Sequence, residues 1–393
     1  MQHADQVAYI ERLLEMARAN QRDDAPGITH TAVDTYFSQE RHDREVSTLF
    51  RRYPVVVAFS ARLRKAGDFV TSTDTGQPIL VARGTDGKLR AFLNVCRHRS
   101  ATLETRPCGA NKRAFVCPYH GWSYDLTGKL VGITDSAWFG DLDRGMHGLK
   151  QLAVAERCGM VWVVPTALEE GQSADFDIDS FLGTVKPDLQ SWDMASWEVH
   201  SITPIRPRMN WKLVIDTFLE LYHFRYLHGA SVAPLFLDNI TTHERRDRHS
   251  RFAVAKKTLL DIDKEPREKW RLLDHAVMLY NLFPHTVLAY TADHCGVFTS
   301  YPISPDEALI NVSILVDPAV RATKPESYWD TNRDLILAAL AEDFAVGSTI
   351  QSNFRSGANQ VQTFGKFEKA LGWYHAEIDA ALSRSVNLGV GGV

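Results

Sequence analysis

Hydrophobic and polar positions follow different rhythms in successive parts of the chain. Residues 4–19 and 32–52 repeat apolar residues at helical spacing and predict two helices, which Pro26 and Gly27 separate. From Tyr53 onward, short runs of β-branched and aromatic residues alternate with turns, which is typical of strands. These runs lie at 55–59, 79–82, 89–93 and 161–165. An acidic link at 166–190 follows, and mixed helices and strands continue to the end.

This order of elements predicts an α+β fold with two domains. A small all-β domain, residues 55–165, is expected to be inserted in a larger α+β domain. The larger domain would comprise an N-terminal helical part, residues 1–54, and the residues 166–393. A length of 393 residues agrees with two domains rather than one small module.

Composition and charge exclude several classes of function. With 45% hydrophobic and 23% charged residues, the chain is ordinary for a globular protein. A net charge of −4 without a basic block argues against a nucleic-acid partner. No apolar run has the length of a membrane helix, and the first residues lack the apolar core of a signal peptide. We therefore expect a cytoplasmic protein with no membrane partner.

Two short arms in the β-rich part carry the ligands of a metal centre. Cys96 and His98 form the first arm, and Cys117 and His120 form the second after 18 intervening residues. Two thiolates and two imidazoles can bind one zinc ion or a [2Fe–2S] cluster. Each arm supplies one thiolate and one imidazole from a turn, and this arrangement favours the cluster over a structural zinc ion.

The two arms and their flanks, residues 96–99 and 117–124, resemble the Rieske domain of ring-hydroxylating oxygenase α subunits. The resemblance implies a [2Fe–2S] Rieske cluster held by Cys96, His98, Cys117 and His120. It also implies a larger catalytic domain with a helix-grip-like antiparallel sheet and a mononuclear non-haem Fe(II).

A second metal site is indicated by residues 210–228. His223 and His228, with one carboxylate, would form the facial triad of Fe(II) oxygenases, which leaves positions open for O2. Five residues span about 140° around a helix, so the two histidines cannot share one helical face. The helix is expected to end or distort between them, with Gly229 as its stop. Glu220, three residues before His223, would share its face.

The third ligand is expected on a helix predicted at 330–352. Asp343 falls on an apolar stripe, where a carboxylate is costly unless a cation compensates its charge. The stripe consists of Ile336, Leu340, Phe344 and Gly347. Glu342 falls on the opposite side and is interpreted as a solvated surface residue. Asp343 is therefore the preferred ligand, with Glu342 and Asp334 as alternatives.

The family resemblance also assigns His223, His228 and Asp343 to the mononuclear iron. It places Glu220 at the acidic residue that bridges the two metal centres, a position that is Asp in many members. Glutamate at this position resembles a subset of monooxygenases that includes carnitine and glycine-betaine oxygenases. Electrons would pass through Glu220 between neighbouring subunits of a homotrimer, with or without a β subunit.

The chain lacks the Gly-rich fingerprint of NAD or flavin binding and the four-cysteine pattern of plant-type ferredoxins. NAD(P)H would therefore act only indirectly, through a separate reductase with or without a ferredoxin. The predicted function is a terminal oxygenase that uses O2 and these electrons to hydroxylate a small organic substrate.

Two hypotheses compete with that function. The residues Val232, Leu235, Phe236 and Ile240 and the stretch 282–285 would line an apolar pocket and favour an aromatic substrate. Glu220 favours the alternative of a monooxygenase or oxidative demethylase of a quaternary amine or ether. A Rieske electron carrier without oxygenase activity is the hypothesis from another class, and it would not need His223, His228 and Asp343.

Overall fold

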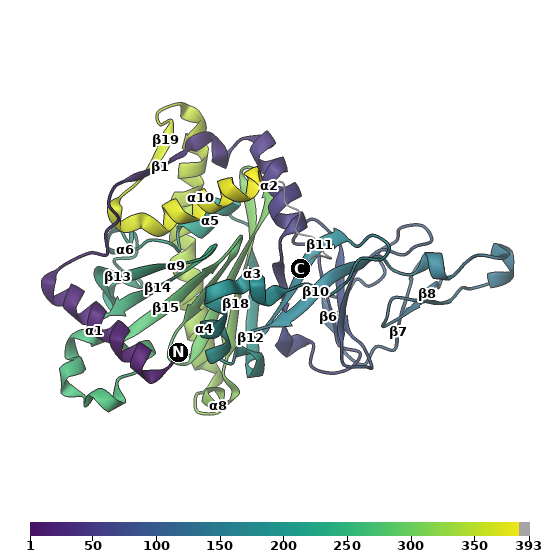
Figure 1. The fold of residues 1–393 in the computed structure, drawn as a ribbon, viewed down its shortest axis with the longest axis horizontal. Helices are drawn as coiled ribbons and strands as arrows, with labels where there is room; N and C mark the ends of the chain where they lie inside the picture. Colours follow the sequence, from purple (N-terminus) through teal and green to yellow (C-terminus); the bar gives the residue numbers. More distant parts are fainter. Residues whose placement is uncertain (385–393) are drawn as a thin grey trace. The chain divides into compact units, whose positions relative to one another are not determined.

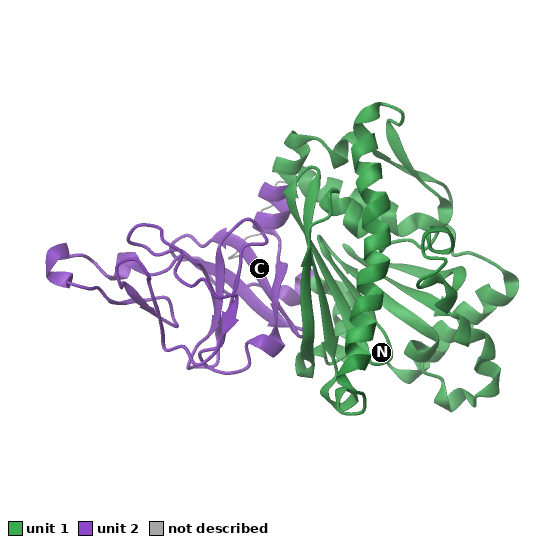
Figure 2. Ribbon diagram, turned by 180° about the vertical axis from the view of Figure 1, so that it is seen from behind, with its two compact units in different colours: residues 1–45, 182–384 green, residues 46–181, 385–393 purple. Residues whose placement is uncertain are grey.

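Residues 1–384, which the computed structural model describes, form two compact units (Figures 1 and 2). The first unit comprises residues 1–45 and 182–384, and the second comprises residues 46–181. The second unit is therefore inserted in the sequence of the first. Helix α2 (Gln39–Arg52) carries the chain from the first unit into the second.

The inserted unit is built from strands. Its main sheet has seven antiparallel strands in the order β2-β11-β10-β5-β4-β3-β6, and a three-stranded sheet has the order β7-β8-β9. The strands are β2 (Val55–Phe59), β3 (Phe69–Ser72), β4 (Ile79–Arg83), β5 (Leu89–Leu93), β6 (Cys108–Gly109), β7 (Ala114–Val116), β8 (Ser123–Asp125), β9 (Leu130–Gly132), β10 (Gln151–Arg157) and β11 (Met160–Ala167). Aromatic side chains such as Phe69, Phe92 and Trp122 fill one core, which also buries Cys96 and Cys117. The motif cysteines thus lie in the aromatic core of this unit.

The larger unit is organised around one antiparallel sheet of seven strands in the order β12-β18-β17-β16-β15-β14-β13. The chain enters at β12, crosses to β13 at the far edge and then returns strand by strand to β18 beside β12. The strands are β12 (Glu198–Ile205), β13 (Phe236–Arg246), β14 (His249–Lys256), β15 (Ala276–Leu282), β16 (Thr286–Tyr290), β17 (His294–Ser304) and β18 (Glu307–Val316). The predicted fold class, an all-β domain inserted in an α+β domain with an antiparallel sheet, is confirmed.

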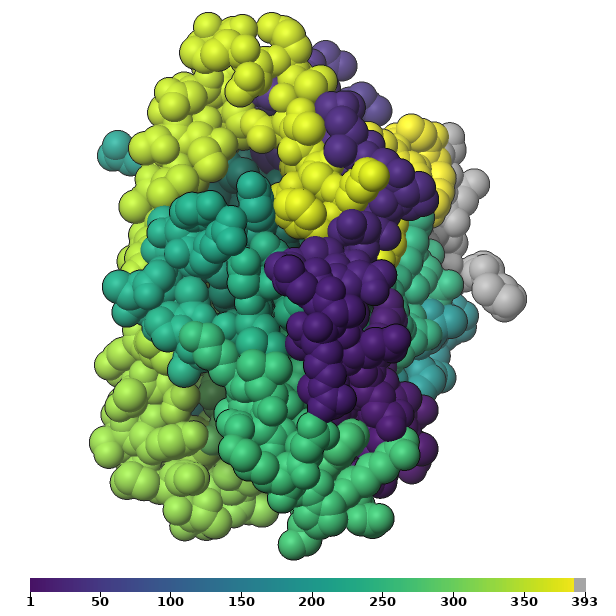
Figure 3. All heavy atoms as spheres, turned by 90° about the vertical axis from the view of Figure 1, so that its left-hand side faces the viewer, coloured from purple at the N-terminus to yellow at the C-terminus, as the bar shows by residue number. Residues whose placement is uncertain are grey.

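The larger unit also contains helices. They are α1 (His3–Ala19), α4 (Lys186–Ser191), α5 (Trp211–Asp216), α6 (Phe224–Leu227), α7 (Leu272–His275), α8 (Pro318–Arg321), α9 (Glu326–Asn353) and α10 (Lys369–Ser383), and α3 (Ile178–Leu182) lies where the chain leaves the inserted unit. Figure 2 shows α9 running across the sheet, where Trp329 packs against Ile314 and Val316 of β18. Figure 3 shows α1 along the surface of this unit, where Tyr9 donates a hydrogen bond to Glu244 of β13.

The prediction of one helix at 32–52 was wrong at its start. Residues Thr29–Ala32 form β1, which pairs with β19 (Val361–Phe364) in a two-stranded sheet. A 3₁₀ turn at Val33–Tyr36 follows, and the α-helix begins only at Gln39. The buried Tyr36 packs on Phe354 at the end of α9, so a tertiary contact prevails over the local helical pattern.

Within the described residues, none of the helices is long and apolar enough to cross a membrane.

A buried ion pair anchors α5 to the start of α2. Lys212 donates a hydrogen bond to Glu45 at 2.7 Å, and both side chains are fully buried. The indole of Trp211 and the guanidinium of Arg41 donate to the same carboxylate at 2.9 and 2.7 Å. Although burial alone would raise it, the Lys212 charge and the hydrogen bonds hold the pKa of Glu45 below its usual value. A carboxylate with this many donors fixes the position of α5, from which the chain continues into the iron site.

We predict that Glu45→Ala lowers the unfolding temperature strongly. The substitution leaves the Lys212 ammonium buried without its partner, which costs about 3–5 kcal/mol and corresponds to roughly 10 °C. The matched control is Asp379→Ala, because Asp379 also pairs with Arg41 but is exposed. That exposed pair contributes only about 0–1 kcal/mol. Calorimetry of both variants checks the difference, and equal shifts would contradict it.

Candidate metal centres and active-site pocket

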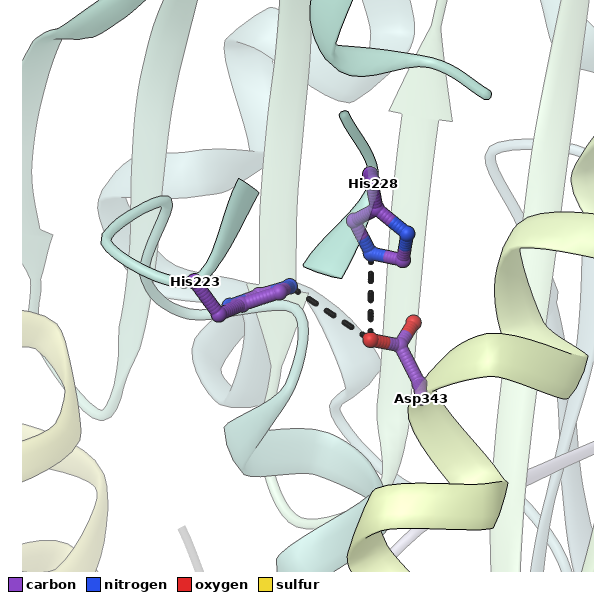
Figure 4. A group of neighbouring side chains, drawn as sticks. All are labelled: His223, His228 and Asp343. Carbon is purple, nitrogen blue, oxygen red and sulfur yellow. Dashed lines mark ion pairs between the residues drawn. The ribbon is translucent and has the colours of Figure 1, made fainter. Parts of the chain in front are cut away.

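Three side chains from two distant segments converge on one point. A ligand atom of each of His223, His228 and Asp343 lies within 4.8 Å of the other two (Figure 4). The Oδ1 atom of Asp343 is 3.1 Å from Nε2 of His228 and 3.4 Å from Nε2 of His223. Both Oδ1 of Asp343 and Nε2 of His223 are buried without a hydrogen-bond partner. Buried polar atoms of this kind are costly unless something binds them, and two imidazoles with one carboxylate are the donor set of a non-haem Fe(II) site.

The two histidines flank a short helix. Helix α5 begins after Asn210, whose side chain accepts a hydrogen bond from the Lys212 backbone at 3.0 Å, and ends at Asp216. A turn leads to His223, the N-cap of α6, and His228 is its C-cap. The helix was expected to break between the histidines, but the break precedes them, and the four residues of α6 fill the interval. Because His223 and His228 lie at the two ends of α6, the offset of about 140° along a continuous helix does not keep their rings apart.

Asp343 lies on the face of α9 that the sequence predicted. It is buried on the same stripe as Leu340, Phe344 and Gly347. Asp334, an alternative ligand, is exposed and pairs with Arg333. The apolar stripe thus brings one carboxylate into the interior, toward the two imidazoles.

Glu342 is not the solvated residue that the helical pattern predicted. Its Oε2 accepts hydrogen bonds from Nδ1 of His228 at 2.6 Å and from the hydroxyl of Ser231 at 2.7 Å. These two hydrogen bonds hold the pKa of Glu342 below its usual value. Helical periodicity placed Glu342 opposite the apolar stripe of α9. The chain at 228–231 contacts Glu342 on that side of the helix.

Glu220 contacts His223 through a turn, not through the helical face that the sequence suggested. Residues 217–223 lie outside the helices. The Glu220 carboxylate accepts hydrogen bonds from the backbone N–H of Tyr222 and, at 3.3 Å, from that of His223. It also contacts Nδ1 of the His223 imidazole. Each iron-site histidine therefore has Nδ1 on a glutamate, Glu220 or Glu342, while Nε2 faces Asp343. An acceptor on one ring nitrogen fixes which nitrogen is free to bind a metal.

The charges around His228 oppose its burial. Burial alone would lower the pKa of this imidazole, but the neighbouring carboxylates of Asp343 and Glu342 raise it above the usual value. A site that attracts a proton to this degree also attracts a metal cation, which competes with the proton for Nε2.

A mainly apolar pocket of about 400 Å³ opens beside the triad. Its wall includes His228 and Asp343 together with Phe218, Phe224, Phe236 and Phe298. The rings form two pairs, with centroids 4.6 Å apart for Phe218 and Phe298 and 5.8 Å apart for Phe224 and Phe236. Of the predicted lining residues, Val232, Leu235 and Phe236 are present in the described wall, whereas Ile240 and the stretch 282–285 are not.

The cluster motif forms a second centre in the inserted unit. Cys96 and Cys117 are buried, and the rings of His98 and His120 lie 4.7 Å apart. Nδ1 of His98 is buried without a hydrogen-bond partner, which suits a metal ligand. Two thiolates and two imidazoles are the donor set of a Rieske [2Fe–2S] cluster.

One tyrosine contacts this centre in a way that the spacing of the motif does not reveal. The hydroxyl of Tyr124 lies 3.4 Å from Sγ of Cys96 and accepts a hydrogen bond from the backbone of Arg97 at 2.9 Å. Hydrogen bonds to ligand sulfur atoms are among the factors that set the potential of an iron–sulfur cluster.

Comparisons with known proteins agree with both centres. Residues 53–139 match the family model for the Rieske [2Fe-2S] domain, and residues 194–384 match the model for the ring hydroxylating alpha subunit, catalytic domain. The glycine betaine monooxygenase oxygenase subunit of Chromohalobacter salexigens is 31% identical over 309 residues, which cover 69% of this chain and 67% of the relative. The carnitine monooxygenase oxygenase subunit of Escherichia coli is 26% identical over 332 residues, 82% of this chain and 83% of the relative.

Solved structures share the fold. A crystal structure of a quaternary ammonium Rieske monooxygenase superimposes with a TM-score of 0.78 at 19% identity and covers 91% of this chain and 96% of that chain. Naphthalene 1,2-dioxygenase from Rhodococcus sp. gives a TM-score of 0.73 at 17% identity and covers 97% and 99%. The family models and the relative with 31% identity show that this chain belongs to the Rieske oxygenase α subunits, oxidoreductases that use O2 with a [2Fe–2S] cluster and a mononuclear iron.

Proposed function

We propose that this oxygenase hydroxylates a small organic substrate, an aromatic compound in the first place, at an iron bound by His223, His228 and Asp343. The observation that carries the proposal is the pocket of about 400 Å³ beside the three ligand atoms, with phenylalanine rings on its wall. Flat apolar molecules pack well between aromatic rings. A ring bound there would have one edge beside the triad.

Each metal group has its own set of residues. We assign the [2Fe–2S] cluster to Cys96, His98, Cys117 and His120, within a domain that we propose spans residues 55–165. The remaining parts, residues 1–54 and 166–393, would form the catalytic domain. When bound, the cluster supplies single electrons and the mononuclear iron supplies coordination positions for O2.

The protein side of the mechanism follows from the polar contacts. Glu220 and Glu342 hold Nδ1 of the two imidazoles, so that both Nε2 atoms stay directed at the metal. Asp343 supplies the negative charge that a divalent cation needs. The apolar wall orients the substrate and keeps water away from the reacting carbon.

Oxidative demethylation of a quaternary amine is the second candidate. The similarity to glycine betaine and carnitine monooxygenase subunits supports it, as does the glutamate at position 220. Aromatic rings bind quaternary ammonium groups by cation–π attraction, so the four phenylalanines of the wall would suit such a substrate as well.

Electrons would come from a separate reductase, with or without a ferredoxin, and the enzyme would act as a homotrimer. Exposed apolar side chains support an assembly: Trp138 is 84% exposed and Met146 67% in one unit, and Tyr226 is 74% exposed beside the iron site in the other. We propose that Glu220 links His223 to His98 or His120 of a neighbouring subunit. The contact of Glu220 with His223 supports the near half of this bridge.

A substrate panel tests the proposed reaction. We expect aromatic compounds that fit about 400 Å³ to couple NADH and O2 consumption to product with a surrogate reductase. Quaternary amines of similar size form the second arm of the panel. Product formed only from quaternary amines would replace the first candidate with the second. Electron transfer without product in both arms would favour the electron carrier.

The third ligand can be separated from its neighbour on α9. We expect Asp343→Ala to lower the iron content from three to two per chain and to abolish turnover, while the cluster absorption stays. Glu342→Gln keeps a hydrogen-bond acceptor for His228 and should bind all three irons, with activity reduced about 10- to 100-fold. Iron quantification and visible spectra check both variants. Three irons in Asp343→Ala would disprove the assignment.

The bridge makes Glu220 essential for electron transfer rather than for metal binding. Glu220→Gln should hold both metal groups, yet reoxidise its pre-reduced cluster at least about tenfold more slowly when O2 and substrate are added. Glu220→Asp should be intermediate. The control is Glu368→Gln, because Glu368 is a nearby carboxylate that instead accepts from the backbone of Gly365. A wild-type rate in Glu220→Gln would remove the bridge, and single-turnover kinetics supply the measurement.

A further inference from the structure

The pocket has a polar end that the triad does not use. Its wall follows one side of α9 from Asp343 back through Ile336 to Tyr328. Fifteen residues of helix correspond to about 22 Å, so Tyr328 lies far from the iron ligands along the pocket. The residues gathered there are Lys256, Thr291, Asp293, His294, Tyr328 and Asn332. A purely apolar substrate would leave this end without a function.

The carboxylate at the polar end is already satisfied. Asp293 accepts hydrogen bonds from Tyr328, from Nδ1 of His294 at 2.7 Å and from the hydroxyl of Thr291 at 3.2 Å. Burial opposes its ionisation, but the hydrogen bonds from His294 and Tyr328 lower the pKa of Asp293 to about 2. Asp293 is therefore a fixed carboxylate whose lone pairs are engaged, and it has little capacity left for a ligand.

The cation at the polar end has no carboxylate in direct contact. Lys256 is the last residue of β14 and the one lysine or arginine among the described residues of the wall. Its ammonium donates to the carbonyl of Leu273 at 2.6 Å and forms no ion pair within residues 1–384. Burial lowers the pKa of Lys256, and the charges of Asp274 and Asp293 act on it in the opposite direction without a direct contact. An ammonium has three N–H donors, so two remain for a ligand in the pocket.

We propose that Lys256 binds an anionic group of the substrate, a carboxylate, while the carbon to be oxidised lies beside His228 and Asp343. This inference rests on the proposed function and names its substrate class: molecules with an apolar or methyl-bearing end and a carboxylate at a distance. Phenylalanine rings hold the apolar end, and the charge at Lys256 sets which way round the molecule binds. Aromatic carboxylic acids and betaines both meet this description.

The test uses matched pairs of ligands that differ only in charge. The probes are ω-phenylalkanoates of increasing chain length and the corresponding amides, titrated by calorimetry into the holoenzyme. We expect the best acid to bind about 10- to 100-fold more tightly than its amide, because its hydrogen bond to Lys256 is charge-assisted. The chain length at which this ratio peaks reports the separation between Lys256 and the triad.

Three variants assign the preference to the charge. Lys256→Met should bring the acid-to-amide ratio close to one, and Lys256→Arg should retain a preference for the acid. Lys257→Met is the matched control, because Lys257 follows directly in sequence but lines a different cavity. It should behave as the wild type.

A purely structural role for Lys256, through Leu273, would weaken both members of each pair equally. An unchanged ratio in Lys256→Met therefore overturns the proposal, as does a wild type that prefers amides or binds no acid in the series. Binding is measured without turnover, so the two proposals fail separately. Acids that bind through Lys256 but give no product would refute the proposed hydroxylation alone.

Discussion

The buried carboxylate of Asp343 is the constraint around which the catalytic unit is organised. It lies on the apolar stripe of α9, and its Oδ1 has two imidazole nitrogens as neighbours and no hydrogen-bond donor. An ionised carboxylate in such surroundings is unfavourable unless a cation balances it. The helix that carries Asp343 packs on β18 through Trp329, so the ligand is held by a long rigid element. The buried Asp343 carboxylate therefore suits a cation, and we propose that an iron ion binds there.

Carboxylates also orient the two histidines, through the ring nitrogen Nδ1. Glu220 and Glu342 each bind the nitrogen that faces away from Asp343. The two glutamates come from different elements, a turn before α6 and the outer side of α9, yet they do the same for their partner rings. An imidazole with an anionic acceptor is a stronger ligand, so both glutamates would strengthen metal binding at the site that we propose. Three carboxylates therefore surround the two imidazoles. The two glutamates contact one ring each, whereas Asp343 lies close to the Nε2 atoms of both rings.

The buried contacts that hold α5 are polar, whereas the wall of the pocket is mainly apolar. Below the site, the buried contacts of Glu45 with Lys212 and Trp211 fix α5 and hence the turn that carries Glu220. Beside it, the wall is mainly apolar, and its polar groups lie partly at the triad and partly around Asp293 at the other end. A rigid polar anchor under the ligands and a mostly apolar wall around the substrate are compatible, because the polar atoms of the anchor are paired with one another. Proteins that share this fold include a glycine betaine monooxygenase subunit and a naphthalene 1,2-dioxygenase, which are named for substrates of different chemistry.

The local sequence determined the chemistry of this protein, and the tertiary structure decided the contacts. Two Cys–His arms, the histidine pair and a carboxylate on an apolar stripe are properties of residue type and spacing, so the sequence alone made Cys96, His223 and Asp343 candidate ligands. The strands at 55–59 and 89–93 likewise follow from β-branched and apolar runs.

Helical periodicity says which side a residue occupies, but not what comes to cover that side. It therefore assigned Glu342 to solvent, although the chain at Ser231 returns over it. It also predicted that Glu220 and His223 share a helical face, whereas a turn brings these two residues into contact. Lys256 shows the limit most clearly. Its sequence context is an ordinary strand end, and only the packing of β14 beside α9 places its charge in the wall of the pocket.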